Sequence, residues 1–199
     1  MVITTPDFAE MAKEAALRFE KFAGLPAEVC CVETKEEAHA AKFSVTGKAW
    51  VLDADLWLVR PVGLPELQPN VIYATPAVPS PAGWAFIRER AAVASIDPHC
   101  WFSGGFFGAD FDSRELLTAM QEARKYAQAW AITDRDEEPL NVGIQRAGVP
   151  VALLQSRYNW HPRCGCRGYG YESRIGPAAI HAGGMPPAEK LAFLRTYCS

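Results

Sequence analysis

Two aspartates, Asp53 and Asp55, stand one residue apart directly after the apolar run 49–52. Taking an unpaired carboxylate out of water is costly, so a buried pair needs a counter-charge. A divalent cation supplies one, because Mn²⁺ and Mg²⁺ prefer oxygen ligands and commonly keep open positions for phosphate oxygens. The alternative is a solvated turn, since Asp-x-Asp is a common pattern. The pair predicts a metal site only if the chain brings further ligands to it.

The residues before this pair predict the elements that would position it. Apolar patterning indicates strands at 2–3, 29–32 and 49–52 and helices at 8–22 and 35–41. Alternating strands and helices favour an α/β fold, a Rossmann-like, mostly parallel sheet flanked by helices with right-handed crossovers. Ligands of such sheets bind beyond the carboxyl ends of the strands, which is where Asp53 and Asp55 stand.

The second half of the chain is less regular. A proline-rich surface excursion over 60–81 is expected to contain a strand at 71–74, and a further strand is expected at 149–154. Ser113 is expected to cap a helix whose apolar stripe reaches Trp130, and Asp134 to cap a shorter one.

The composition favours one domain over residues 1–199, because a chain of this size that is 49% hydrophobic can bury a sizeable core. A net charge of -3 provides no basic field over the whole protein. No apolar run is long enough for a bilayer, and the N-terminus lacks the order of a signal peptide. We therefore expect a cytoplasmic protein with no membrane partner and, given six irregularly spaced cysteines, reduced thiols.

Short motifs along the chain fall in one order: Ala41-Lys42-Phe43, Asp53-Ala54-Asp55, Phe102-Ser103-Gly104, Asp136-Glu137-Glu138-Pro139-Leu140-Asn141, Tyr158-Asn159 and His181-Ala182-Gly183-Gly184. In this order they resemble retaining glycosyltransferase family 8, which includes glycogenin and bacterial galactosyltransferases. The resemblance implies a GT-A fold and a metal-dependent glycosyltransferase that retains configuration. The chain departs from the family in three places. Phe102 replaces an Asn, Glu137 replaces a Gln, and the Lys-Pro-Trp after the histidine is absent, with Lys190 coming later.

The resemblance also implies roles for single residues. His181 would be the third protein ligand beside Asp53 and Asp55, a sensible set because Mn²⁺ accepts one imidazole among oxygens. Asp136 would hold sugar hydroxyls, and Glu137 would stabilise or attack the anomeric carbon. The donor would be a nucleoside-diphosphate sugar, preferably a UDP-sugar, that carries a hexosyl or pentosyl group. Its diphosphate would bind to Mn²⁺ or Mg²⁺. Its contacts would be Thr4, Lys42, Asp53, Ser103, Gly104 and Gly183.

Most of these residues also have a purely structural interpretation. Lys42 would then be an ordinary exposed lysine, and Ser103 and Gly104 part of a glycine-punctuated strand. Asp136 and Glu137 would form an acidic first turn stabilised by the helix dipole. His181 would be a structural histidine after an apolar strand.

Two other functions fit parts of the sequence. Asp53 and Asp55 also resemble the first motif of haloacid-dehalogenase-like phosphatases, in which the first aspartate is the nucleophile. The second function is that of a non-enzymatic binding protein with zinc at His161, Cys164 and Cys166. This set lacks a fourth ligand, because it consists of Cys-x-Cys and one histidine.

The acceptor is indicated only by the segment from Arg157 to Arg174. It mixes arginines with tyrosines and a tryptophan, a combination that suits nucleic acid, so a modified DNA base is one candidate acceptor and a glycan another. The alternative is a solvated loop with snorkelling arginines.

Overall fold

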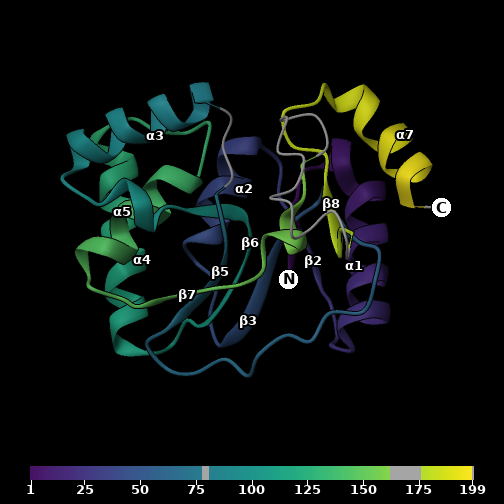
Figure 1. Ribbon diagram of the computed structural model, residues 1–199, viewed down its shortest axis with the longest axis horizontal. Helices are drawn as coiled ribbons and strands as arrows, with labels where there is room; N and C mark the ends of the chain where they lie inside the picture. Colours follow the sequence, from purple (N-terminus) through teal and green to yellow (C-terminus); the bar gives the residue numbers. More distant parts are fainter. Residues whose placement is uncertain (78–80, 162–175, 199) are drawn as a thin grey trace.

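A six-stranded sheet runs through the middle of the molecule in the order β2-β1-β3-β6-β5-β7 (Figure 1). The computed structural model describes residues 1–77, 81–161 and 176–198. Its strands are β1 (Val2–Thr4), β2 (Val29–Cys31), β3 (Lys48–Asp53), β5 (Ile72–Pro76), β6 (Phe102–Asp110) and β7 (Val151–Leu153). Five run in one direction and β6 runs against them. The expectation of a mostly parallel sheet is therefore confirmed.

Helices cover both faces of this sheet. In Figure 1, α1 (Ala9–Ala23) and α7 (Pro187–Cys198) lie on one side, and α3 (Pro81–Ala94), α4 (Arg114–Ala129) and α5 (Glu137–Arg146) lie on the other. The other helices of the described residues are α2 (Lys35–Lys42) and the 3-10 helices η1 (Pro6–Phe8), η2 (Pro98–Cys100) and η3 (Ser156–Asn159). In the part of the chain that the structure describes, no helix is both long and apolar enough to cross a membrane.

A second, two-stranded sheet follows Asp55 directly. Strand β4 (Leu56–Leu58) pairs antiparallel with β8 (Ala179–His181), so that Leu56 lies opposite His181. Both strands are fully buried, which suits their apolar sequences. This pairing brings the C-terminal part of the chain to the end of β3.

Successive side chains of β3 point to opposite faces of the sheet and pack into two different hydrophobic cores. Trp50 and Leu52 pack on the side of α1, together with Phe19 and the small sheet. Val51 points to the other side, where it packs with Leu116 of α4 and residues of α5. Because both faces of β3 are covered, the prediction that the continuous apolar run 49–52 forms a buried strand is confirmed.

The helix ends agree with the sequence in most places. Gly24 ends α1 in the left-handed conformation, with a φ of 69°. Thr34 and Glu37 form a capping box at the start of α2. The expectation that Asp134 caps the shorter helix is wrong, because α5 begins after Asp136. The Asp136 side chain makes no capping hydrogen bond, since its carboxylate is paired with Lys42.

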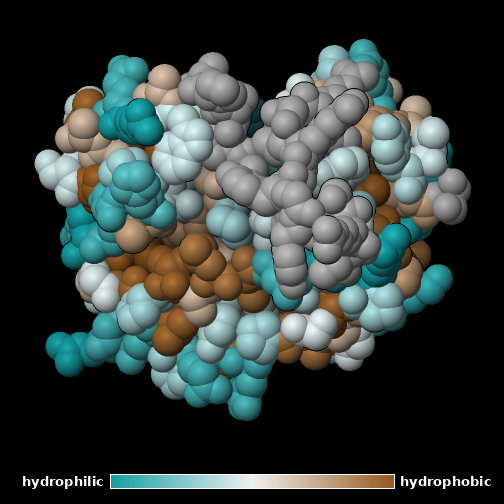
Figure 2. Space-filling view, in the orientation of Figure 1, coloured by the Kyte–Doolittle hydropathy of each residue, from teal (hydrophilic) through white to brown (hydrophobic). Residues whose placement is uncertain are grey.

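The strand β7 forms one edge of the sheet. Leu153 in this strand is 56% exposed, and Figure 2 shows apolar surface over this side of the molecule. The opposite edge is β2, where Val29 and Cys31 are also exposed.

Candidate active site

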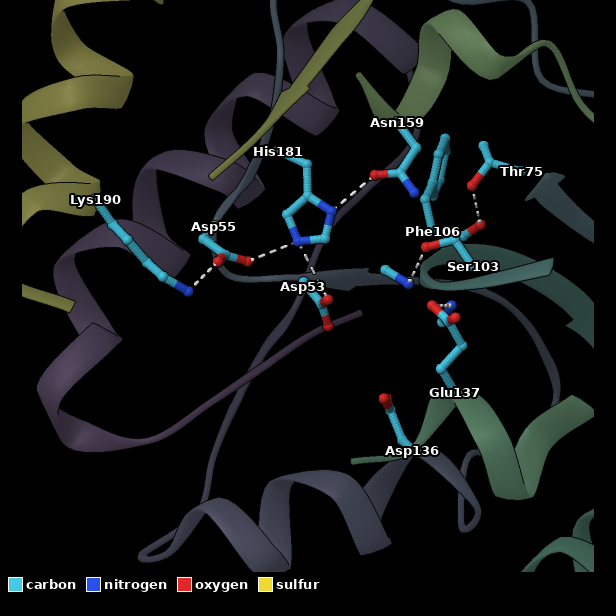
Figure 3. A network of polar contacts seen from close by, with 12 residues as sticks. Asp53, Asp55, Thr75, Ser103, Phe106, Asp136, Glu137, Asn159, His181 and Lys190 are labelled. Atoms are coloured by element: carbon cyan, nitrogen blue, oxygen red, sulfur yellow. Dashed lines mark hydrogen bonds and ion pairs between the residues drawn. The ribbon is translucent and has the colours of Figure 1, made fainter. Parts of the chain in front are cut away.

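The end of β3 and the strand β8 bring two aspartates and a histidine together (Figure 3). Nε2 of His181 lies 3.1 Å from Oδ1 of Asp55 and 3.5 Å from Oδ2 of Asp53. One ligand atom from each of the three residues lies within 4.8 Å of the others. The backbone N–H of Ala182 donates to the carbonyl of Asp55 at 2.9 Å, which ties the turn after β3 to β8. The structure therefore brings these three predicted residues together.

Asn159 orients the imidazole of His181. Nδ1 of His181 lies 2.7 Å from the amide oxygen of Asn159, so Nδ1 carries the donated proton and Nε2 faces the aspartates. Burial disfavours the charged ring, but the carboxylates of Asp55 and Asp53 outweigh this and raise the pKa of His181. Two carboxylates and one imidazole nitrogen match the ligand preference of Mn²⁺, and Nε2 faces the two carboxylates as a nitrogen ligand of such an ion would.

Lys42 joins Asp53 at the end of β3 to Asp136, the residue before α5. Its ammonium donates to Oδ1 of Asp53 at 2.5 Å and to the carbonyl of Gly104 at 3.0 Å, and it is paired with Asp136. Burial alone would lower the pKa of Lys42, but the two carboxylates raise it well above its usual value. The interpretation of Lys42 as an exposed lysine is wrong. It is a buried, charged link between two acidic residues.

Glu137 is held from two directions beside this link. Nε1 of Trp101 donates to Oε1 of Glu137 at 2.8 Å, and the N–H of Gly104 donates to Oε2 at 3.3 Å. Burial raises the pKa of Glu137, the two donors partly offset this, and the carboxylates of Asp136 and Asp53 raise it further. An ordinary exposed acidic turn would not fix both oxygens, so the dipole alone does not account for this residue.

A loop of hydrogen bonds attaches α5 to β6. The side chain of Asn141 accepts from the N–H of Phe102 at 2.9 Å and donates to its carbonyl at 2.8 Å. It also donates to the carbonyl of Glu137 at 2.8 Å. Since Ser103 and Gly104 follow Phe102 directly, this attachment sets the distance between β6 and the start of α5.

A cleft of about 700 Å³ opens beside the aspartates. Its walls include Thr4, Lys42, Asp53, Asp55, His181 and Gly183, which are all predicted site residues. Phe8, Lys35, His39 and Lys190 complete much of the remaining wall. Ser103, Gly104, Asp136 and Glu137 do not line this cleft. They lie on the other side of Lys42 and Asp53, so the predicted site has two adjoining halves.

Glycines keep the metal-ligand half open. A Cβ on Gly105 would come within 2.7 Å of Cε1 of His181 and 3.1 Å of Oδ2 of Asp53. A Cβ on Gly183 would lie 2.9 Å from Cε1 of His161 and 3.3 Å from Nε2 of His181. At both positions a larger residue would have to displace a side chain of the site.

Three residues of the site were not predicted to act there: Asn159, Trp101 and Lys190. The sequence indicated Asn159 only as part of the Tyr158-Asn159 motif, with no role in the site. Lys190 is paired with Asp55, a contact that its late position in the chain concealed. Trp101 offered no signal, because its partner Glu137 lies 36 residues away.

Other predicted residues are only partly described. His161 packs its ring 4.2 Å from that of His181, and burial with the neighbouring His181 charge lowers its pKa to about 3. Cys164 and Cys166 of the proposed zinc set lie outside the described residues. So does most of the segment from Arg157 to Arg174. Its described start carries Arg157, whose guanidinium lies 6.0 Å from the ring centre of Tyr158.

The structure is similar to solved glycosyltransferases. It matches the bifunctional glycosyltransferase WbbM with a TM-score of 0.60 at 12% identity, over 92% of this chain and 45% of that chain. It matches a glycosyltransferase involved in the glycosylation of the major capsid of PBCV-1 with a TM-score of 0.61 at 12% identity, over 98% of each chain. The galactosyltransferase LgtC, in complex with donor and acceptor sugar analogs, matches with a TM-score of 0.57 at 13% identity, over 92% of this chain and 87% of that chain.

These similarities establish the fold. The chain has the mixed α/β fold of glycosyltransferases, as the resemblance implied. It spans less than half of the length of WbbM. No protein-family model matches the sequence, and no curated protein matches it. Membership of family 8 in particular stays a prediction.

Proposed function

We propose that this protein is a metal-dependent glycosyltransferase that moves a sugar from a nucleoside-diphosphate sugar to an acceptor hydroxyl, with retention of configuration. The observation that carries the proposal is the meeting of Asp53, Asp55 and His181 at the mouth of a cleft, on a glycosyltransferase fold. A UDP-sugar is the favoured donor and Mn²⁺ the favoured ion, with Mg²⁺ as the alternative. The order of the motifs resembles that of family 8.

The two halves of the site divide the donor between them. Thr4 and Gly183 line the cleft for the nucleotide, and Phe8 offers an aromatic wall there. A bound Mn²⁺ or Mg²⁺ would offset the negative charge that develops on the diphosphate as it leaves. Ser103 and Gly104 would border the sugar, and Asp136 would accept hydrogen bonds from its hydroxyls.

Glu137 and the acceptor complete the proposed reaction. The bond between the anomeric carbon and the diphosphate oxygen breaks, and the acceptor oxygen bonds to that carbon from the same face. The acceptor proton passes to the departing diphosphate. Glu137, fixed by Trp101 and Gly104, stabilises the positive charge of the sugar in between. The acceptor class is a glycan or a modified DNA base.

A thermal-shift screen of nucleoside-diphosphate sugars, with and without Mn²⁺, tests this function. A donor at 100 times its Kd adds about 2.7 kcal/mol to the stability of the folded state. For a protein of this size that raises Tm by roughly 5–10 °C. We expect this rise only when Mn²⁺ and a nucleoside-diphosphate sugar are both present, with the UDP-sugars giving the largest effect.

Asp55→Asn is the decisive variant in this screen. It keeps the shape of the side chain but removes its charge, so we expect no metal-dependent shift and no turnover. Asp134→Asn, at a side chain that is 68% exposed, is the matched control and should behave as wild type. A full shift in Asp55→Asn, or none in wild type with any donor, would contradict the proposal.

The phosphohydrolase alternative makes a different prediction. It requires Asp53 to attack a phosphoryl group, whereas Oδ1 of Asp53 is occupied by Lys42. The similarity in fold is also to glycosyltransferases. Hydrolysis of an aryl phosphate that Asp53→Asn abolishes would favour this alternative.

A further inference from the structure

Both carboxylate oxygens of Asp55 already have cationic or donor partners within the protein (Figure 3). Oδ1 faces Nε2 of His181 at 3.1 Å, and Oδ2 is paired with the ammonium of Lys190. The side chains of Asp55 and Lys190 are only 11% and 16% exposed. Burial would raise the pKa of Asp55, but His181 and Lys190 together hold it well below its usual range.

Lys190 reaches Asp55 from the first turn of α7 and also lines the cleft. Its ammonium lies 5.5 Å from the ring centre of Phe8, on the wall assigned to the nucleotide. One side chain therefore touches a metal-ligand residue and borders the space for the diphosphate. A lysine can serve both, because its ammonium is a point charge on a flexible stem.

A divalent cation at Asp55 must either displace this ammonium or lie beside it. Displacement costs the ion pair, and coexistence places two positive charges a few ångströms apart where water screens them little. Either way, Lys190 weakens the binding of a metal alone. A diphosphate in the cleft reverses this effect, because its negative charge stabilises the ammonium and the metal together.

We propose that Lys190 makes metal binding and nucleotide binding depend on each other: it neutralises Asp55 before either ligand binds, and it pairs with the diphosphate once both are present. This inference rests on the proposed function. It makes Lys190 a residue that binds the donor directly. Metal and nucleotide then bind with positive cooperativity, and metal alone binds weakly.

Lys190→Met tests the inference through Mn²⁺ affinity, measured from the free-ion signal in electron paramagnetic resonance with and without UDP. Methionine keeps an apolar stem beside Phe8 and removes the charge. We expect the variant to bind Mn²⁺ about 10-fold more tightly without UDP, a size typical of coupling between two sites. The factor by which UDP strengthens Mn²⁺ binding should fall by a similar amount.

Two further variants separate charge from position. Lys190→Arg keeps the cation and should bind Mn²⁺ much as wild type does. Arg195→Met removes a cation from the same helix, one that pairs with Glu10 and is 58% exposed, and should change neither quantity. Equal tightening in Arg195→Met would overturn the inference, because the effect would then be a general loss of charge.

The inference and the proposed function fail in different ways. If wild type binds Mn²⁺ in a manner that Asp55→Asn abolishes, but Lys190→Met leaves both the affinity and the UDP factor unchanged, the inference about Lys190 is wrong and the proposed function stands. If wild type shows no Mn²⁺ binding that depends on Asp55, even with UDP, both are wrong.

Discussion

Asn159 decides which nitrogen of His181 faces the two aspartates. Its amide oxygen lies 2.7 Å from Nδ1 of His181 and accepts the proton of that nitrogen, so that Nε2 faces Asp53 and Asp55. Partners of this kind set the tautomer and the ring orientation of metal-binding histidines. The chemistry of the site thus depends on a side chain that would not touch the metal itself.

Asn159→Leu should weaken Mn²⁺ binding by about 10- to 100-fold, the usual cost of losing such a partner. Leucine offers no acceptor, so the Nδ1 proton is left buried and the ring is free to turn. Isothermal titration with Mn²⁺ and UDP measures the effect. Asn159→Asp keeps an acceptor oxygen and should retain most of the affinity, whereas equal losses in both variants would point to simple disruption of packing.

Glu137 should give the pH–rate profile of the proposed reaction an acid limb, which is a fall in rate as pH decreases through the raised pKa of this residue. Its pKa lies above the ordinary value of 4.5 because of burial, and the ionised form accumulates only above that raised pKa. UDP release from a UDP-sugar should therefore increase as pH rises through it. Trp101→Phe removes a donor that lowers this pKa, so the limb should move to higher pH. An unchanged limb in Trp101→Phe would exclude Glu137 as its origin.

The same shift has an effect on folding with a definite sign. Since its folded-state pKa is raised, Glu137 binds its proton more tightly in the folded protein than in the unfolded chain. Its contribution to stability is therefore unfavourable above the raised pKa and disappears as pH falls toward the ordinary value. Ionisation of this buried carboxylate therefore lowers the stability of the folded protein, a cost that functional sites often carry.

Some residues of the site could be predicted because their signal is local. Asp53 and Asp55 follow an apolar run directly, whereas His181 was grouped with them only through the motif order of the resemblance. Asn159 and Lys190 could not be assigned in this way. Their roles depend on contacts with His181 and Asp55, 22 and 135 residues away, and a lone polar residue does not specify a distant partner.

Among the elements, β6 has the largest influence on the site. It pairs antiparallel with β3, and Leu52 lies opposite Phe106. The first residues of β6 therefore lie at the same end of the strands as the last residues of β3. Gly104 and Gly105 lie beside Asp53 for this reason. A parallel β6 would have placed them at the opposite end of the strands.

The helices α4 and α5 pack closely at Gly143, which makes this contact a test of element packing. A Cβ there would come within 2.3 Å of the carbonyl oxygen of Ala119. Gly143→Ala should force the helices apart and lower the free energy of unfolding by about 1–3 kcal/mol. Urea denaturation measures this loss. Gly63→Ala, where a Cβ meets nothing within 4 Å, is the control and should be nearly neutral.

The elements differ in how well the sequence predicts them. The strands at 29–32, 49–52, 71–74 and 149–154 and the helices at 8–22 and 35–41 are confirmed within a few residues. The direction of β6 could not be predicted, because a continuously buried strand carries no information on its polarity. Helix α7 was also missed, although Leu191, Leu194 and Cys198 fall at helical spacing and pack against the core on the side of α1.

At the scale of the whole molecule, two apolar cores enclose one sheet, and the polar residues of the site gather at its edge. Similarity to glycosyltransferases at 12–13% identity shows that this arrangement tolerates almost complete replacement of residues. The order of strands and helices therefore predicts the α/β class, whereas the glycosyltransferase fold was implied by the motif resemblance. The acceptor is not encoded in that order, and the sequence leaves it open.

Lys42 has a consequence for how the protein folds. Its ammonium joins Asp53, Gly104 and Asp136, which come from β3, β6 and the residue before α5. Its hydrogen-bond partners lie 11 and 62 residues away, so none of these segments holds the site by itself. Such long-range contacts form late, after the loops between them have closed. Folding intermediates that lack any one of these segments would have no complete donor site, and we expect donor binding to report on the finished native state alone.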